Sequence, residues 1–369
     1  MLKLACLLLI LPLALCGCSS RNGIEQRAYA VALGMDGDGI GPLTLTVSVP
    51  RVSKPSEDKP KGGGDYLHFS ASGDGWPEAL AALRQAVPRA LNLSHIALLA
   101  VSESLAASDH FPGLVNQLAE TRNLYTATRV VVCPGRASDF IQSDGPLLGA
   151  RLSSEIDGAM THFAALGTIP DTCLADLYCA ANSIYGDIAV AAGRTLSTGD
   201  AAEAAALISP GPADVTATPA DCAYAGSALF SGGQMRLRLD ARDTQRLNLV
   251  TGGLRLARAE VGGRSVELTV AGPVRRQMAV RGEAAALSID LDLRAREPLT
   301  EAESRAVEGE IAEAVTRVVH ACQRVELDPF GFAEDASRHF LTLRAWRGFD
   351  WRAAYAAAPL TIRVSVRVG

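Results

Sequence analysis

The chain has 369 residues, of which 48% are hydrophobic, 20% are charged and 5% are aromatic, and its formal net charge is −5. This length and apolar content allow two or three domains with large cores. Because the chain contains no block of basic residues, the sequence does not indicate binding to nucleic acid.

The first residues have the pattern of an export signal. Lys3 precedes a Leu-rich apolar run over residues 4–15, which is too short to span a membrane. Residues 15–18 read Leu-Cys-Gly-Cys, an order typical of the lipid acceptor in bacterial lipoproteins. The sequence therefore predicts a signal peptide over residues 1–17 and lipidation of Cys18, with a plain signal peptide cut nearby as the alternative. Two or more acyl chains would hold the mature chain stably on a membrane.

Residues 18–208 are predicted to form an N-terminal α+β region of one or two subdomains, with a flexible loop over residues 51–65. Leu and Val alternate with Thr and Ser over residues 43–49, and a Gly-rich turn precedes them, which predicts a hairpin with residues 27–34.

Further elements of this region follow from periodicity and from Pro and Gly positions. Strands are expected at residues 66–72, 95–101 and 129–133. Helices are expected at residues 76–91 and 111–120, and Pro88 should end or kink the first of them. Residues 139–192 are Ala-rich and are expected to consist mainly of helices and loops.

Residues 209–220 are predicted to be a linker, because Pro and Gly cluster there and the composition changes from Ala-rich to alternating. Residues 221–369 are then a C-terminal α+β domain. Its expected strands are residues 223–230, 235–239, 265–270, 287–293 and 360–368. A long helix at residues 300–324 has one apolar stripe, formed by Val307, Ile311, Val315, Val318 and Cys322. The predicted fold class is α+β, with mixed sheets and packed helices in two to three domains and an antiparallel-rich last sheet.

The mature chain has an odd number of cysteines, which does not describe a disulfide framework. They are Cys133, Cys173, Cys179, Cys222 and Cys322. If residues 171–181 form one helix, Cys173 and Cys179 lie about 9 Å apart along its axis, beyond the roughly 7 Å that a disulfide spans. Buried thiols are favoured over a bridge, and the sequence leaves the redox state open.

The sequence contains no nucleophile elbow, zinc-protease helix, P-loop or dinucleotide fingerprint. Residues 36–39 resemble the start of a calcium loop, but Val47 stands where the loop needs a Glu, so a turn is favoured. Two other segments stand out, residues 89–95 with Arg89 and His95, and residues 328–332. A structural role is favoured for both, the second as a turn that two Phe side chains pin to the sheet. No catalytic residue, cofactor or metal is predicted.

These features together resemble the Ger(x)C spore germination lipoproteins, the C subunits of germinant receptors. The similar blocks are spread over most of the mature chain. They are Glu25 with residues 28–36, residues 69–73 with the following helix, Arg89 and His95, residues 226–230, and the long helix with residues 328–331, Trp346, Trp351 and the last strand. The chain departs from the family pattern at Ser19, where a Trp is common, and at Ala333, where a Gly is common.

The resemblance implies a three-domain α+β body without known catalytic activity. It also implies a lipid-anchored position on the outer face of the inner spore membrane. The implied partners are the multi-pass A and B membrane subunits, with which the chain would act in nutrient-triggered germination. The resemblance does not specify the nutrient or whether this chain contacts it.

Two other functions stay open from the sequence. One is a solute-binding envelope lipoprotein, which needs two lobes around a ligand cleft. The other is an envelope hydrolase without a recognisable motif, which needs Ser, His and an acid brought together in space.

Overall fold

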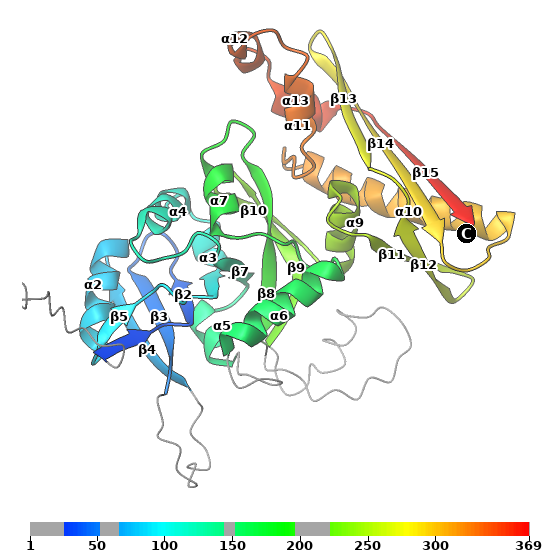
Figure 1. Cartoon of the computed structure of the whole chain (residues 1–369). Coiled ribbons are helices and arrows are strands. Elements are labelled where there is room, and N and C mark those ends of the chain that lie inside the picture. The colour runs from blue at the N-terminus through cyan, green and yellow to red at the C-terminus, as the bar shows by residue number, and fades with distance from the viewer. Residues whose placement is uncertain (1–25, 52–65, 144–151, 196–221, 369) are drawn as a thin grey trace, which may run out of the picture.

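A computed structural model describes residues 26–51, 66–143, 152–195 and 222–368 of the chain. The described residues form an eight-stranded sheet and a five-stranded sheet, both with packed helices, and a separate pair of short strands (Figure 1). The predicted α+β class with mixed sheets is confirmed.

The first sheet and its helices form the N-terminal unit. Its elements in chain order are β1 (Arg27–Tyr29), β2 (Ala32–Asp36), β3 (Leu43–Pro50), β4 (Tyr66–Gly73), α2 (Trp76–Ala86), β5 (Ala90–Asn92), β6 (Leu98–Ser102), α3 (Glu103–Ala106), α4 (Phe111–Glu120), β7 (Arg129–Cys133), α5 (Ala137–Ser143), α6 (Leu152–Ala165), α7 (Leu174–Ala181), β8 (Asp187–Thr195), β9 (Cys222–Ser231) and β10 (Gln234–Leu239).

The strand order of the first sheet is β10-β9-β8-β7-β6-β2-β3-β4. The central strands β2, β6, β7 and β8 pair in parallel, whereas the flanking pairs are antiparallel. All five residues of β6 are buried, because successive side chains point to opposite faces and helices cover both faces. Leu99 and Val101 face one core, and Leu98 and Ala100 face the other.

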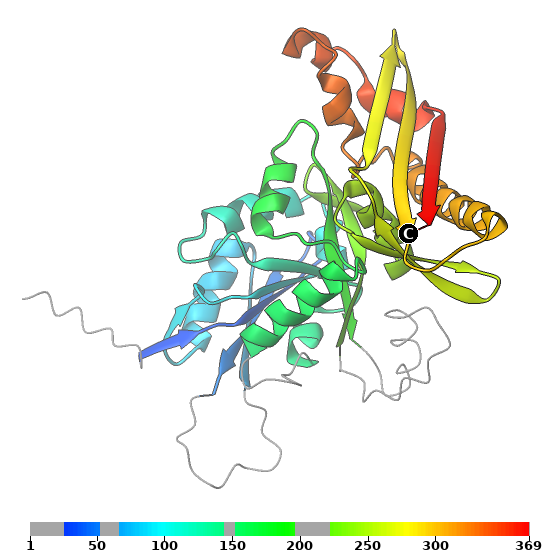
Figure 2. The same ribbon diagram turned by 45° about the vertical axis from the view of Figure 1, so that its right-hand side comes forward.

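Helices α2, α4 and α7 pack on one face of this sheet through apolar side chains such as Leu83, Val115 and Leu177. Helices α5 and α6 pack on the opposite face through Phe140 and Ile156. In Figure 2 the helix α6, in green, crosses in front of the strands. The N-terminal unit is therefore a sheet between two helical layers.

Several predicted boundaries in this unit change. The predicted first strand at residues 27–34 is interrupted at Ala30. Before this residue the backbone pairs with β5, and after it the backbone pairs with β3 as the expected hairpin. Helix α2 ends at Ala86, shortly before Pro88, and residues 90–92 form β5 instead of continuing the helix.

The expectation of a mainly helical segment at residues 139–192 is wrong at its end. Helices α5, α6 and α7 are present, but the segment finishes as strand β8, which pairs with β7 and β9. Close packing around β8 leaves little room for larger side chains. A Cβ atom on Gly193, for example, would lie 2.8 Å from the Phe140 ring and from Val131. Tertiary contacts thus override the helical preference of alanine.

The second sheet and its helices form the C-terminal unit. Its elements are α9 (Ala241–Thr251), β11 (Leu256–Val261), β12 (Arg264–Val270), β13 (Arg275–Arg281), β14 (Ala284–Ala295), α10 (Glu301–Gln323), α11 (Phe332–Ser337), α12 (Leu343–Arg347), α13 (Trp351–Ala357) and β15 (Leu360–Val368). The strand order is β11-β12-β14-β13, and β15 pairs with β14 in parallel while the other pairs are antiparallel.

Helix α10 packs its predicted apolar stripe against this sheet. Every residue of the stripe is at most 1% exposed, as are Ile289 and Leu291 of β14. The helix begins after Thr300, whose hydroxyl accepts from the Glu303 amide while the Glu303 carboxylate accepts from the Thr300 amide. This capping box satisfies two backbone donors at the helix start.

The predicted linker at residues 209–220 lies outside the described residues. Strands β9 and β10, which the sequence placed in a C-terminal domain of residues 221–369, complete the first sheet by pairing with β8. The change from one sheet to the other falls at α9, later in the chain than predicted. Helix α9 contacts both units, since Asn248 donates to the carbonyls of Gly167 and Ile169 and Arg246 pairs with Glu310 of α10.

Candidate functional site

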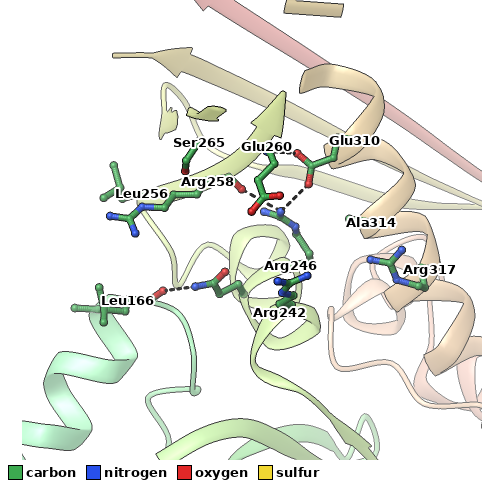
Figure 3. Close-up of a pocket in the computed structure, with 12 residues that line it drawn as sticks. Leu166, Arg242, Arg246, Leu256, Arg258, Glu260, Ser265, Glu310, Ala314 and Arg317 are labelled. Atoms are coloured by element: carbon green, nitrogen blue, oxygen red, sulfur yellow. Dashed lines mark hydrogen bonds and ion pairs between the residues drawn. The ribbon is translucent and has the colours of Figure 1, made fainter. Parts of the chain in front are cut away.

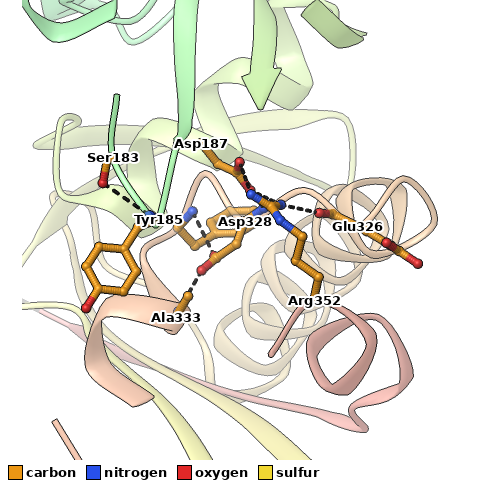
Figure 4. A network of polar contacts seen from close by, with 8 residues as sticks. Ser183, Tyr185, Asp187, Glu326, Asp328, Ala333 and Arg352 are labelled. Carbon is orange, nitrogen blue, oxygen red and sulfur yellow. Dashed lines mark hydrogen bonds and ion pairs between the residues drawn. The ribbon is translucent and has the colours of Figure 1, made fainter. Parts of the chain in front are cut away.

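A polar cluster with two buried aspartates joins the N-terminal unit to the C-terminal unit (Figure 4). We call it the polar junction, and it consists of Asp187, Glu326, Asp328 and Arg352. Arg352 of α13 binds the Asp187 carboxylate of β8 through two hydrogen bonds of 2.9 Å each. The same guanidinium donates to the Glu326 carbonyl at 2.8 Å, and the Asp328 amide donates to Asp187 at 2.7 Å. The Asp187 side chain is fully buried.

The local sequence after α10 builds the C-terminal half of the junction. Glu326 adopts a left-handed φ of 54° and Gly331 a φ of 78°, so the chain reverses twice within a few residues. The Asp328 carboxylate accepts from the amides of Phe330 at 3.3 Å and Ala333 at 2.7 Å. Phe330 and Phe332 are at most 1% exposed, so they pin this turn to the core as the sequence predicted.

The N-terminal half of the junction is the segment that leads into β8. The Ser183 hydroxyl accepts from the Tyr185 amide at 3.1 Å, and the Asp187 amide donates to the Tyr185 carbonyl at 2.7 Å. The Tyr185 ring lies 6.0 Å from the Trp346 ring of α12. The Arg352 guanidinium lies 4.2 Å from the centre of the Trp351 ring, a cation–π contact. Aromatic contacts thus link the same two segments that the ion pair joins.

Burial dominates the electrostatics of this cluster. It raises the pKa of Asp328 to about 6, against the opposing effect of its backbone donors, and the nearby Asp187 charge raises it further. Asp328 is 4% exposed and the Asp187 side chain is not exposed, so neither carboxyl can reach a substrate. The polar junction therefore holds the two units together and has no access for chemistry.

The other residues singled out in the sequence do not converge on one site. Cys18 lies outside the described residues. Arg89 is exposed, and His95 contacts the Tyr29 ring at 4.8 Å and the Ser94 hydroxyl at 3.0 Å. Asp38 accepts from the amides of Ile40 and Gly41, which is a turn geometry.

Two Ser–His contacts occur in the part of the chain that the structure describes, and neither extends to an acid there. The Ser48 hydroxyl lies 3.0 Å from Nδ1 of His68, and the Ser94 hydroxyl lies 3.0 Å from Nδ1 of His95. Among the described residues no carboxylate hydrogen-bonds or pairs with either imidazole, as a catalytic triad requires. Within the same residues, no group of three His, Cys, Asp or Glu side chains is arranged to hold a metal ion.

The cysteines occupy dispersed positions. Cys173, Cys179 and Cys322 are thiols, and the side chain of Cys222 lies outside the description. Helix α7 begins at Leu174, later than the sequence suggested, and the Asp176 carboxylate accepts from the Cys173 amide at 2.9 Å and from its thiol at 3.1 Å. Burial raises the pKa of the Cys322 thiol well above its usual value, which makes this thiol inert.

Sequence reasoning missed Asp187 and Arg352, the two charges at the centre of the junction. They are 165 positions apart and belong to different units. Asp187 begins a strand that was expected to be mainly helical, and Arg352 is one of many arginines. No local pattern marks such a pair, so their partnership is visible only in three dimensions.

No helix in the described ranges combines the length and the apolar character that crossing a membrane requires. Two family profiles match the sequence in order. The profile "Spore germination protein N-terminal domain" matches residues 20–192, and the profile "Spore germination B3/GerAC like, C-terminal" matches residues 225–369. The comparison with curated proteins gave no match.

The fold is similar to that of one solved structure, titled "Crystal Structure of the GerBC protein". The similarity has a TM-score of 0.54 at 13% sequence identity, and it covers 94% of this chain and 99% of that chain. At this identity the likeness establishes the fold, while the two family profiles establish the relationship. The chain therefore belongs to the Ger(x)C family of spore germination proteins.

Proposed function

We propose that this chain is a non-enzymatic lipoprotein subunit of a spore germinant receptor. In this proposal it acts with multi-pass A and B membrane subunits in nutrient-triggered germination, on the outer face of the inner spore membrane. The observation that carries the proposal is the match of both family profiles, in order, over the two halves of the chain.

The N-terminal sequence supports the membrane position. Cys18 follows a short apolar segment and a Leu-x-Gly-type triplet, and the profile match begins at residue 20, directly after it. Lipidation of Cys18 would tether the body without a membrane-spanning helix.

The site geometry supports a non-enzymatic role. The Asp187 and Asp328 carboxylates of the polar junction are buried, and the two Ser–His contacts of the described residues have no acid partner. A body whose two units are joined by a buried ion pair suits a subunit that transmits or organises contacts with membrane partners. A solute-binding lipoprotein is less well supported, because the second sheet is mostly antiparallel and differs from a lobe of parallel strands with crossover helices.

Substitution of the lipid acceptor tests the proposal. Spores with Cys18→Ala should respond poorly to nutrients, because the subunit loses its anchor, while sporulation proceeds normally. Cys16→Ala is the matched control, because that cysteine leaves with the signal peptide and the variant should germinate normally. Loss of the response is measured as the fall in optical density after nutrient addition, in a strain from which other nutrient receptors have been deleted. Unchanged germination of the Cys18→Ala spores in that strain would contradict the proposal.

A further inference from the structure

A cavity of about 370 Å³ lies where α9, α10 and β11 meet the end of α6 (Figure 3). It is separate from the polar junction, and its wall includes residues of both units. Leu166 of the N-terminal unit forms one side, and Gln245 of α9 donates to its carbonyl at 3.2 Å. The volume is within the range of small-molecule sites in proteins.

Arginine dominates the polar wall of this cavity. Four arginines line it, namely Arg242 and Arg246 of α9, Arg258 of β11 and Arg317 of α10, against two glutamates, Glu260 and Glu310. We call it the arginine cavity. Figure 3 shows Arg242 and Arg246 on the same side of α9, with Arg317 on the neighbouring helix. Arg242 and Arg246 lie one helical turn apart, where like charges repel each other, so their placement does not stabilise α9.

The four arginines differ in whether a carboxylate of the protein pairs with them. Arg258 pairs with Glu267 at 3.0 Å, and Arg317 approaches Asp243 at 3.7 Å, a long contact in which Arg317 is largely exposed. Arg242 is exposed and makes no ion pair or hydrogen bond with a described residue. At least one guanidinium at the cavity therefore remains available to a ligand.

Arg246 is the most buried of the four. Its side chain is 11% exposed, and Nη2 binds Glu310 at 3.2 Å and the Arg258 carbonyl at 3.0 Å. Its Nη1 atom is buried without a hydrogen-bond partner among the described residues. Burial lowers the pKa of Arg246, the Glu310 charge opposes this, and the positive charges of Arg317 and Arg242 lower it further. The Nη1 atom lies beneath the surface, so Arg246 offers the cavity its positive charge rather than a hydrogen bond from this atom.

Glu310 does not neutralise the site fully, because its carboxylate serves two donors of the protein. One oxygen binds Arg246 and the other accepts from the Glu260 amide at 3.0 Å. This arrangement fixes α10 against β11 and holds the guanidinium of Arg246 in place. The cavity is thus a built site with a positive wall and an oriented central arginine.

We propose that the arginine cavity binds a small molecule with at least two negative charges, carried by carboxylate or phosphate groups. Planar guanidinium groups match both kinds of oxyanion, and several of them converging on one volume favour a dianion over a monoanion. A ligand held there contacts both units, so its binding also stabilises their mutual arrangement.

Calorimetric titration of the full-length chain in detergent tests this site. Sodium phosphate and sodium citrate are titrated separately at constant ionic strength, with sodium chloride as the monoanion comparison. We expect saturable binding of phosphate, citrate or both, and no saturable binding of chloride. Binding of phosphate alone identifies a phosphorylated ligand class, and binding of citrate alone identifies a polycarboxylate class.

Arg242→Gln and Arg317→Gln are the test variants, because both side chains are exposed and their loss should not impair folding. Each should weaken the anion affinity by about tenfold. Arg281→Gln is the matched control, since this exposed arginine lies at the end of β13, outside the cavity wall, and its loss should leave the affinity unchanged. Absence of saturable binding of both anions up to millimolar concentrations would overturn the proposal. An equal loss of anion affinity in all three variants would also overturn it. Such a result would mean that the anion responds to the overall positive charge of the surface and not to the cavity.

Discussion

The polar junction and the arginine cavity both bring arginines and carboxylates from distant parts of the chain together, yet they differ in how the charges are satisfied. In the junction, Arg352 and Asp187 form a two-pronged pair, and each has a further backbone partner. In the cavity, Arg242 has no partner among the described residues and Arg246 has a buried donor without one.

This difference separates charges that maintain the structure from charges that can bind. A buried charge requires an opposite charge and hydrogen-bond partners. Where the protein supplies all of these, the charged group has no affinity left for a ligand. Where an exposed arginine such as Arg242 has no partner among the described residues, its charge is available to a molecule from solution. We accordingly expect the junction to determine the stability of the folded chain, and the cavity to determine its affinity for an anion.

The largest expected effect comes from breaking the junction. Arg352→Met leaves the Asp187 carboxylate buried without its counter-charge, which should lower the free energy of unfolding by about 3–5 kcal/mol. Urea unfolding followed by tryptophan fluorescence measures the change, and Trp351 lies directly beside the substituted residue.

Arg363→Met is the matched control for that substitution. Arg363 pairs with Asp290 on the exposed face of the sheet, where its side chain is 70% exposed, so the loss should cost less than about 1 kcal/mol. If the two substitutions had equal effects, the distinction between the buried pair and a surface pair would fail.

A smaller effect is expected from the titration of Asp328. Because its pKa in the folded chain is about 6 and its usual value is near 3.8, the folded state retains a proton that the unfolded state releases between these pH values. The free energy of unfolding should therefore fall as the pH rises from about 4 through 6, by up to roughly 3 kcal/mol from this group. Asp328→Asn removes that slope.

The measurement is urea unfolding of both proteins at intervals from pH 4 to pH 7.5. The stability of Asp328→Asn relative to the unsubstituted chain should increase across this window. A relative decrease would show that the backbone donors of Ala333 and Phe330 outweigh burial and stabilise the charged carboxylate.

Elements with strong periodicity could be predicted from the sequence, and elements built from small residues could not. The stripe on α10 and the alternation along β14 identify both elements because large apolar residues recur at the right spacing. Strand β11 faces the core with Ala257 and Ala259, and β8 with Ala191 and Ala192, whose weak hydrophobicity gives little signal. The pairing of β9 with β8 is non-local and crosses the predicted domain boundary.

The sites show the same limit. Asp328 was found because Asp-Pro-Phe-Gly is a local turn pattern, but its neighbours Asp187 and Arg352 are set by the contact between the two units. The cavity arginines lie at ordinary polar positions of two helices and of strand β11, where charged residues are the norm. Nothing in the sequence distinguishes them from the solvated charges elsewhere on α10.

The receptor-subunit role is tested most directly by isolating the tagged chain from spore membranes after crosslinking. The account predicts that the chain is recovered in the membrane fraction together with two multi-pass membrane proteins, and that Cys18→Ala abolishes this co-recovery. Recovery of the unsubstituted chain from the membrane without either multi-pass protein would contradict it.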